Sequence, residues 1–233
     1  MNKTNSLSVI VPVLNEENNI RKAIRNMLKS FSDLNIDWEL ILINDGSSDG
    51  TDKVIDELSQ SSPQIKILHH KSPMGVGFSV REGMQVATKD AVVYYPGDDE
   101  ADPTEIFKYL PLLEHVDMVV PFLVNKEIRS KSRRFLSDLF LLIINFSFGT
   151  SFNYTQGTVI LKKRIFDVVN QKSNGFFFQT ECLVKASKAG FTFAEVPYRG
   201  RGKLKSHSKA TSLKSLVAVS LGYLRLLYEV YLK

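Results

Sequence analysis

The chain has 233 residues, of which 43% are hydrophobic and 24% charged, with a formal net charge of +5. This balance is that of a globular protein and excludes disordered, collagen-like and coiled-coil chains, while the basic excess favours anionic partners such as phosphates, nucleic acid or an acidic membrane face. A single cysteine, Cys182, excludes an internal disulfide framework and a cysteine-based zinc cluster. The first residues lack a long apolar core ahead of a cleavage site, so we expect no signal peptide and a cytoplasmic chain.

The first half of the chain alternates short apolar runs with amphipathic helical patterns. Strands are predicted at residues 7–13, 38–43, 65–68 and 91–95. Helices are predicted between them, at residues 16–31, 51–58 and 77–87, from apolar residues at i, i+3 and i+4 spacing. This alternation is typical of βαβ units and predicts an α/β fold with a parallel sheet. Because ligands of such sheets bind at the carboxyl ends of the strands, the polar segments after each strand are the first candidates for a site.

The second half is less regular. It predicts helices at residues 103–113 and 180–189, and strands at residues 116–120, 158–161 and 191–196. A basic run at 129–134 precedes an apolar stretch at 135–148, which is too short and too polar, with Asp138 and Asn145, to span a membrane. The tail at 213–233 is helical in pattern and mostly apolar. Without repeats or an obvious linker, we expect one compact unit.

Two interpretations of the apolar stretch and the tail stay open. As basic and apolar helices, they suit the interface of an anionic bilayer, which predicts a peripheral membrane contact. Alternatively, they pack against the sheet or against a second subunit of a homo-oligomer.

Three polar turns follow strands of the first half, at residues 12–16, 44–50 and 96–103. Helix capping by Asn15, Asp49 and Asp102 explains each turn separately. It does not explain why all three project from one edge of the sheet, nor why two adjacent carboxylates, Asp98 and Asp99, follow a strand directly. Such carboxylates repel each other unless a cation neutralises them, and hard divalent cations bind carboxylate and phosphate oxygens together. A nucleoside diphosphate held by Mg²⁺ or Mn²⁺ fits this pattern.

The segments 9–17, 43–51 and 74–77, with Gly83, occur in an order that resembles family-2 glycosyltransferases of the GT-A fold, and most of all the dolichyl-phosphate mannose synthase-like branch. The resemblance covers about residues 7–209. It implies a Rossmann-like, mostly parallel sheet flanked by helices, and an inverting transfer of sugar from a nucleoside-diphosphate sugar to a polyprenyl-phosphate or saccharide acceptor. It also implies a catalytic domain over residues 1–212, with a nucleotide-binding half (1–103) and an acceptor half (104–212), followed by an amphipathic helix at 213–233.

The resemblance also implies roles for single residues of the nucleotide half. The nucleotide base and ribose would be lined by Pro12, Asn15, Glu16 and Asp45. The backbone at Gly75 and Gly77 would lie close to the nucleotide, as glycine permits.

The family's paired-aspartate metal motif is only partly present. Aligned on Pro103, Asp99 matches the second aspartate, Asp98 the middle position and Gly97 the first aspartate. The resemblance thus implies a metal held by Asp99 with help from Asp98, and the missing carboxylate keeps open a catalytically weak or dead nucleotide-sugar binder. A nucleotidyltransferase is the other enzyme alternative, but the segment 12–17 lacks the glycine-rich basic signature that such enzymes carry.

The acceptor half carries one acidic candidate and one basic loop. By resemblance, Glu181 would act as general base on an acceptor hydroxyl, a role needed only if the acceptor is not already ionised. The alternative is a solvated glutamate at a helix start. The loop 199–209 is similar to a family loop in which Arg201, Ser208 and Lys209 would close over the diphosphate. Since Tyr198 is its only nearby aromatic residue, we expect no nucleic-acid binding.

Two further residue types are expected to be structural. The pair His69 and His70 is predicted to end a strand rather than to bind a metal, and Cys182 is predicted to lie in the core.

Overall fold

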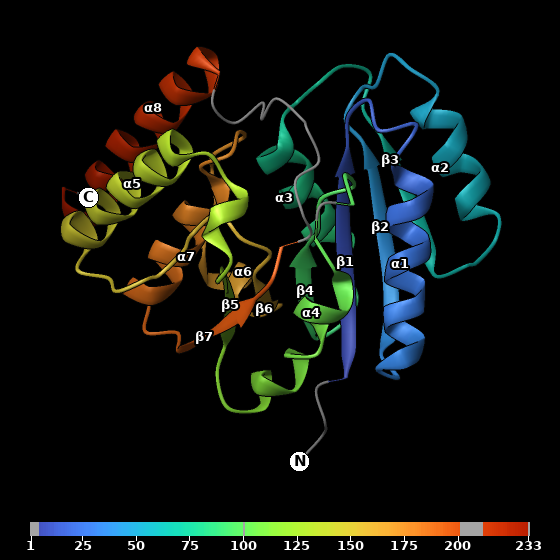
Figure 1. The fold of residues 1–233 in the computed structure, drawn as a ribbon, viewed down its shortest axis with the longest axis horizontal. Coiled ribbons are helices and arrows are strands. Elements are labelled where there is room, and N and C mark those ends of the chain that lie inside the picture. Colours follow the sequence, from blue (N-terminus) through green and yellow to red (C-terminus); the bar gives the residue numbers. More distant parts are fainter. Residues whose placement is uncertain (1–4, 100, 201–211, 233) are drawn as a thin grey trace.

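The computed structural model describes residues 5–99, 101–200 and 212–232. Its centre is a seven-stranded sheet in the order β3-β2-β1-β4-β6-β5-β7 (Figure 1). The strands are β1 Ser6–Val13, β2 Asp37–Asn44, β3 Ile65–His69, β4 Ala91–Tyr94, β5 Met118–Leu123, β6 Ile160–Lys162 and β7 Phe193–Tyr198. Only β6 runs antiparallel to its neighbours, β4 and β5. The prediction of an α/β fold with a mostly parallel sheet is confirmed.

Helices cover both faces of the sheet (Figure 1). One face packs against α1 Ile20–Asp33, α2 Thr51–Ser59 and α4 Pro103–Phe107. The other face packs against α3 Val76–Val86, α6 Ile165–Val168 and α7 Phe178–Lys188. Outside α7 lie α5 Lys131–Phe148 and α8 Leu213–Tyr231, and two short 3₁₀ helices, η1 Leu110–Glu114 and η2 Lys126–Ile128, connect strands and helices.

The central strands are buried on both faces because their side chains alternate between two cores. In β1, Val9 and Val11 belong to the core beneath α1, whereas Ile10 belongs to the core beneath α3. The neighbouring β2 continues both layers, since Val9 pairs with Leu40 and Ile10 with Ile41. Strands covered on both faces read as continuous apolar runs, which is why the sequence predicted them.

The outer helices form a third apolar cluster with α7. Ile144 and Phe148 of α5 meet Leu226 of α8 over Val184 of α7. The hydroxyls of Ser147 and Tyr223 share a hydrogen bond at 2.7 Å, so α5 and α8 also contact each other directly. The helix predicted for the tail is therefore present, and its inner face is packed.

Two predicted helices differ from the structure, and one further helix is present. The helix predicted at 103–113 divides into α4 and η1, because Pro111 has no backbone N–H to donate within a helix. The helix predicted to begin at Glu16 begins at Ile20, after a positive φ of 58° at Asn15. Helix α6 was not predicted.

Candidate active site

Strand β1 lies between β2 and β4, and the turns that follow these three strands meet at one edge of the sheet. From β1 the chain continues to β2 on one side of β1, and it later forms β4 on the opposite side. The strand order therefore reverses at β1, and such a topological switch point is where α/β proteins bind ligands. The three polar turns of the sequence therefore do converge, and we take this edge as the candidate site.

The turns after β1 and β2 are held together by hydrogen bonds. The backbone N–H of Asn15 donates to Ser47 Oγ at 3.0 Å, and the N–H of Ser48 donates to Asn15 Oδ1 at 2.8 Å. Glu16 is tied to the same turn, since its N–H donates to Thr51 Oγ1 at 2.9 Å. Pro12 lies within β1, opposite Ile43 of β2. The structure thus places Pro12, Asn15 and Glu16, all predicted to bind the nucleotide, close together where β1 ends and the next turn begins.

Asp45 fixes the glycine-rich segment that precedes α3. Its carboxylate accepts hydrogen bonds from the backbone N–H groups of Met74 and Gly75, at 2.7 and 2.9 Å, and from His70 Nδ1 at 2.8 Å. The residue is only 4% exposed. The sequence predicted a carboxylate facing the nucleotide, whereas the structure gives Asp45 three partners from its own chain.

His70 also lies at this edge of the sheet. From the sequence, the pair His69 and His70 was predicted only to end a strand. The Nε2 of His70 lies 2.6 Å from Glu82 Oε2, while its Nδ1 faces Asp45. Burial alone would lower the pKa of His70, but the hydrogen bonds and charges of Glu82 and Asp45 outweigh burial and raise it. The sequence could have indicated His70 as a site residue by its position, because it directly follows β3 at the same edge of the sheet as the three turns.

Gly75 and Gly77 allow the segment 173–174 to approach α3. A Cβ atom on Gly77 would lie 2.2 Å from the carbonyl oxygen of Ser173, and its N–H donates to the Asn174 carbonyl at 2.7 Å. Gly75 has a φ of 97°, and a Cβ there would lie 2.5 Å from the same Asn174 carbonyl oxygen. The close backbone approach expected toward a nucleotide is therefore, in this structure, an approach of the protein's own chain.

The two adjacent aspartates point to different surroundings. Asp99 has a positive φ of 57° and is 4% exposed. Its Oδ1 accepts a hydrogen bond from Asn26 Nδ2 at 2.6 Å and its Oδ2 lies 2.8 Å from Lys22 Nζ, so α1 engages both oxygens. Asp98 is half-buried, and its charge adds to burial in raising the pKa of Tyr94.

Gly97 explains why the first carboxylate of the motif is missing. A Cβ atom at this position would lie 2.8 Å from Val13 Cγ1 and 3.1 Å from Ile20 Cδ1. A side chain at residue 97 would therefore enter the core between β1 and α1, so this backbone leaves no room for a carboxylate directed at the site.

The fit of this turn to a divalent cation rests on Asp98. Among the described residues there is no group of three or more His, Cys, Asp or Glu side chains that could hold a metal ion. Asp99 does not fit as placed, because Lys22 and Asn26 already engage its oxygens. Asp98 fits as one carboxylate ligand, with the remaining positions left to a substrate's oxygens.

Glu181 lies in a closed ionic network between α7 and α8. It is 1% exposed and accepts hydrogen bonds from the N–H groups of Lys172 and Ser173 at 3.0 and 2.8 Å. The ammonium of Lys185 lies 2.7 Å away, and the guanidinium of Arg225 3.6 Å. Burial alone would raise the pKa of Glu181, but these partners hold it below its ordinary value. The alternative of a solvated glutamate is wrong, because the carboxylate is buried and is engaged by partners of its own chain.

Most of the predicted basic loop, residues 199–209, lies outside the residues that the structure describes. Arg201, Ser208 and Lys209 lie outside the described residues. Gly200, just before them, is bound to Asn125 by two hydrogen bonds of 3.0 Å, one from its N–H and one to its carbonyl.

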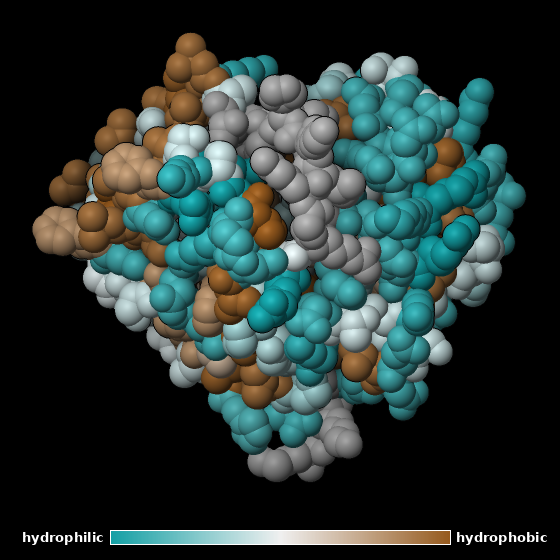
Figure 2. All heavy atoms as spheres, in the orientation of Figure 1, coloured by the Kyte–Doolittle hydropathy of each residue, from teal (hydrophilic) through white to brown (hydrophobic). Residues whose placement is uncertain are grey.

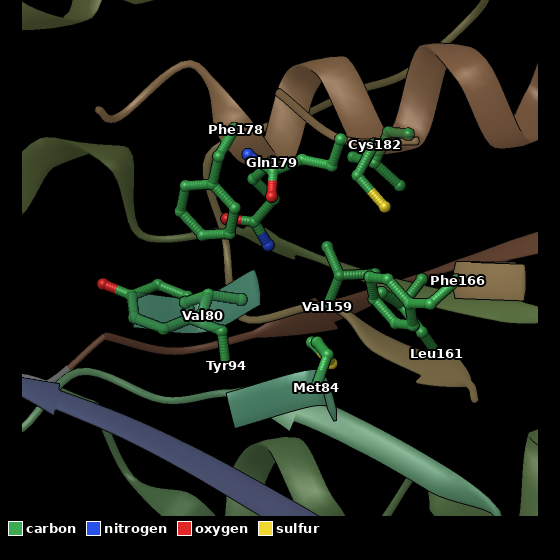
Figure 3. A pocket seen from close by; sticks show the side chains of 11 residues that line it. Val80, Met84, Tyr94, Val159, Leu161, Phe166, Phe178, Gln179 and Cys182 are labelled. Atoms are coloured by element: carbon green, nitrogen blue, oxygen red, sulfur yellow. The ribbon is translucent and has the colours of Figure 1, made fainter. Parts of the chain in front are cut away.

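A small apolar cavity lies beside the candidate site (Figure 3). The rings of Tyr94 and Phe178 border one end, with their centroids 5.3 Å apart, and Cys182 lines the α7 side. Burial raises the pKa of the Cys182 thiol to about 12, so it stays protonated, and its predicted place in the core is confirmed. An apolar lining of this kind does not suit a charged ligand.

The model of the family "Glycosyl transferase family 2" matches residues 8–170. The chain belongs to this family. The match includes the turns after β1, β2 and β4 and ends before Glu181.

Curated relatives agree with this assignment over a little less than half of the chain. An uncharacterized glycosyltransferase of Synechocystis is 34% identical over 46% of this chain, and the uncharacterized glycosyltransferase YibD of Escherichia coli is 32% identical over 45%. A Proteus mirabilis protein named as undecaprenyl-phosphate 4-deoxy-4-formamido-L-arabinose transferase is 32% identical over 45%. The aligned regions span 33%, 29% and 32% of these relatives, about a third of their length.

Solved structures show the same fold over nearly the whole chain. Glucosyl-3-phosphoglycerate synthase of Mycobacterium tuberculosis, solved with Mg²⁺ and uridine diphosphate, superposes with a TM-score of 0.68. The superposition covers 97% of this chain and 79% of that chain at 18% identity. A second structure of that enzyme, with Mn²⁺, UDP-glucose and phosphoglyceric acid, gives a TM-score of 0.66, 97% and 79% coverage and 19% identity. At this identity the likeness concerns the fold, and it confirms the expected GT-A-like architecture.

Proposed function

We propose that this chain is an inverting glycosyltransferase that moves a sugar from a nucleoside-diphosphate sugar to a polyprenyl-phosphate or saccharide acceptor. Membership of the family supports the reaction class. The observation that carries the proposal is the switch-point edge, where Asp45 ties the turn after β2 to the glycine-rich start of α3. The dolichyl-phosphate mannose synthase-like branch is part of this proposal.

The donor nucleotide would lie along the loops that follow β1 and β2. Asn15 is exposed and Glu16 and Pro12 are half-buried there, so their polar and apolar surfaces are open to a base and a ribose. Asp45 would act on the nucleotide mainly by holding the Gly75 segment in place. Arg201 and Lys209 would stabilise the negative charge that develops as the diphosphate leaves, as cations of a closing loop do.

A divalent cation is the second part of the proposal. When bound, Mg²⁺ or Mn²⁺ would neutralise the charge of the diphosphate leaving group. Asp98, half-buried in the turn after β4, would be its carboxylate ligand, with Asp99 held by Lys22 and Asn26 of α1 beside it. The M. tuberculosis enzyme, a distant structural neighbour, was solved with either ion.

Between the two acceptor classes, the surroundings of Glu181 favour a lipid phosphate. A hydroxyl acceptor must lose its proton during attack, whereas a phosphate oxygen is already ionised near neutral pH and needs no base. Glu181 is buried in its ion pairs, and the P. mirabilis relative carries undecaprenyl phosphate in its name. A polyprenyl phosphate is therefore the acceptor we favour.

A nucleotide-sugar binder without transfer activity is the second candidate, and the engagement of Asp99 by Lys22 is what favours it. One experiment separates the two. A panel of nucleoside-diphosphate sugars is first screened for thermal stabilisation with and without Mn²⁺, and the best donor is then incubated with polyprenyl phosphate. Release of nucleoside diphosphate with formation of the glycolipid is the expected result. Stabilisation without turnover would support the binder, and no stabilisation by any donor would contradict both.

A further inference from the structure

Helices α5 and α8 expose many large apolar side chains on one side of the molecule, which we call the outer face. It includes Phe135, Leu142 and Phe146 of α5 and Leu213, Leu221 and Leu224 of α8. Phe146 is 89% exposed and Leu213 79%. Figure 2 shows the apolar residues gathered over these two helices, while the side of α1 and α2 is mainly hydrophilic.

The outer face is distinct from the apolar face that packs α5 and α8 onto the domain. Their inner sides contribute Ile144, Phe148 and Leu226 to the third core cluster. Both helices are thus apolar on nearly all sides, which is typical of helices that are fully covered. A contiguous exposed apolar surface of this kind marks an interaction site.

The charges around the outer face favour an anionic partner. Basic residues flank it: Lys131, Arg133 and Arg134 lie at the start of α5, and Lys214 lies at the start of α8. The two acidic residues of these helices are paired. Glu229 is held inward by Lys172 and Lys185, at 2.6 and 2.7 Å, and Asp138 lies 3.3 Å from Lys126.

We propose that the outer face rests on the surface of an anionic lipid bilayer, with the apolar side chains in the headgroup–acyl boundary and the basic residues on lipid phosphates. Exposed apolar residues beside Lys and Arg are the features of interfacial helices. Neither α5 nor α8 nor any other helix in the described ranges combines the length and the hydropathy of a membrane-spanning segment. The contacts of Tyr223 and Tyr231 with Ser147 keep α8 against α5, so the two helices would lie in the plane of the interface as one unit.

A second copy of the chain is the competing occupant. A two-fold interface sets the same surface of each copy against the other, which would bring the basic residues of both copies together. Because the acidic residues of α5 and α8 are already paired, the outer face offers little to neutralise them. The bilayer is therefore the occupant that the charges favour.

Vesicle flotation tests this proposal without donor or acceptor, so its outcome is independent of the proposed function. The full chain is mixed with vesicles of phosphatidylcholine alone, or of phosphatidylcholine with phosphatidylglycerol. We expect flotation with the anionic vesicles, little with the neutral ones, and weaker binding as salt is raised. The double variant Leu142→Ser with Phe146→Ser should bind at least about tenfold more weakly, because two large apolar side chains no longer enter the boundary.

Two control variants test whether any loss of binding is specific to the outer face: one removes an exposed apolar side chain elsewhere, and the other reverses a charge elsewhere. Val168→Ser changes an apolar residue that is also exposed, but on α6, and should float like the parent chain. Lys131→Glu should weaken binding to anionic vesicles, whereas Lys53→Glu, on α2, should not. Melting temperatures establish that each variant is folded.

Equal flotation of the parent chain and the Leu142→Ser, Phe146→Ser variant would overturn the proposal. So would a stable dimer in analytical ultracentrifugation that dissociates in this variant while the parent chain binds no vesicles, since the outer face would then be an interface between copies.

Discussion

Nδ1 of His70 lies 2.8 Å from Oδ1 of Asp45, the same oxygen that accepts the backbone N–H of Met74. The other ring nitrogen faces Glu82 at 2.6 Å. An imidazole placed between two carboxylates satisfies both only when both nitrogens carry protons. The charge of His70 is therefore coupled to the position of Asp45, and through it to the glycine-rich start of α3.

This coupling predicts a pH dependence. The pKa of His70 is raised above its ordinary value of about 6.5 in the folded chain. Its contribution to the free energy of unfolding is thus fully present below about pH 6.5 and is lost as the pH rises through the raised pKa. We expect the melting temperature to fall over this range in the parent chain, and to fall less in His70→Asn.

The neighbouring histidine provides the control. His69 is exposed and pairs with Asp56, so His69→Asn should keep the pH dependence of the parent chain. If His70→Asn and the parent chain showed the same melting profile from mildly acidic to mildly alkaline pH, the coupling would be wrong.

A second prediction concerns Gly77. Gly77→Ala would bring a Cβ atom to 2.2 Å from the Ser173 carbonyl oxygen and 2.7 Å from Phe178 Cβ, so α3 and the segment 173–174 must separate. Overpacking of this kind destabilises proteins by about 1–3 kcal/mol. Chemical denaturation measures the loss, and we expect nucleotide affinity to fall as well.

Gly175→Ala is its matched control, because a Cβ there meets no atom within 4 Å. It should leave the free energy of unfolding nearly unchanged. Equal stability of both alanine variants would contradict the packing role of Gly77.

The sequence was sufficient to predict the strands of the first half of the chain, because strands buried on both faces leave continuous apolar runs. The strand predicted at 38–43 lies within β2, and that at 65–68 lies within β3. The direction of β6 could not be predicted. It is three residues long, and whether it pairs parallel or antiparallel depends on the path of the chain through α5 rather than on its own residues.

The sequence predicted which turns form the candidate site, but it did not predict where the side chains of these turns point. Asp99 takes a positive φ, which turns its carboxylate toward Lys22 and Asn26, and the neighbouring residues give no sign of this backbone conformation. Glu181 finds partners in Lys172 and Arg225, which lie on segments that only the tertiary structure brings together. Local patterns do not encode such contacts.

The third prediction separates the two aspartates. Asp98→Asn should weaken the Mn²⁺-dependent part of nucleoside-diphosphate binding, because it removes the carboxylate charge that would bind the cation while keeping the size of the side chain. Asp99→Asn should destabilise the fold by about 1–3 kcal/mol, since it disturbs buried contacts with α1. Calorimetry with and without Mn²⁺, together with denaturation, measures both. Loss of metal dependence in Asp99→Asn alone, at unchanged stability, would restore Asp99 as the ligand.

The last prediction concerns Glu181. Glu181→Gln keeps the size of the side chain but removes the charge that faces Lys185 and presents an amide to the backbone N–H groups of Lys172 and Ser173. We expect the free energy of unfolding to fall by about 2–4 kcal/mol, because buried donors lose their acceptor. Glu229→Gln, which removes the charge of the other carboxylate that pairs with Lys185, is the matched control for the network and should also destabilise the chain.

Turnover decides between a structural role and a general base. A positioned base contributes about 10²–10⁴-fold to the rate, so its loss would reduce kcat by that factor even at temperatures where the variant is fully folded. With an ionised lipid-phosphate acceptor and Glu181 closed in its network, we expect kcat of the folded variant to fall by less than about tenfold. A fall of a hundredfold or more at unchanged stability would show that the network opens during turnover, and that the acceptor is a hydroxyl deprotonated by Glu181.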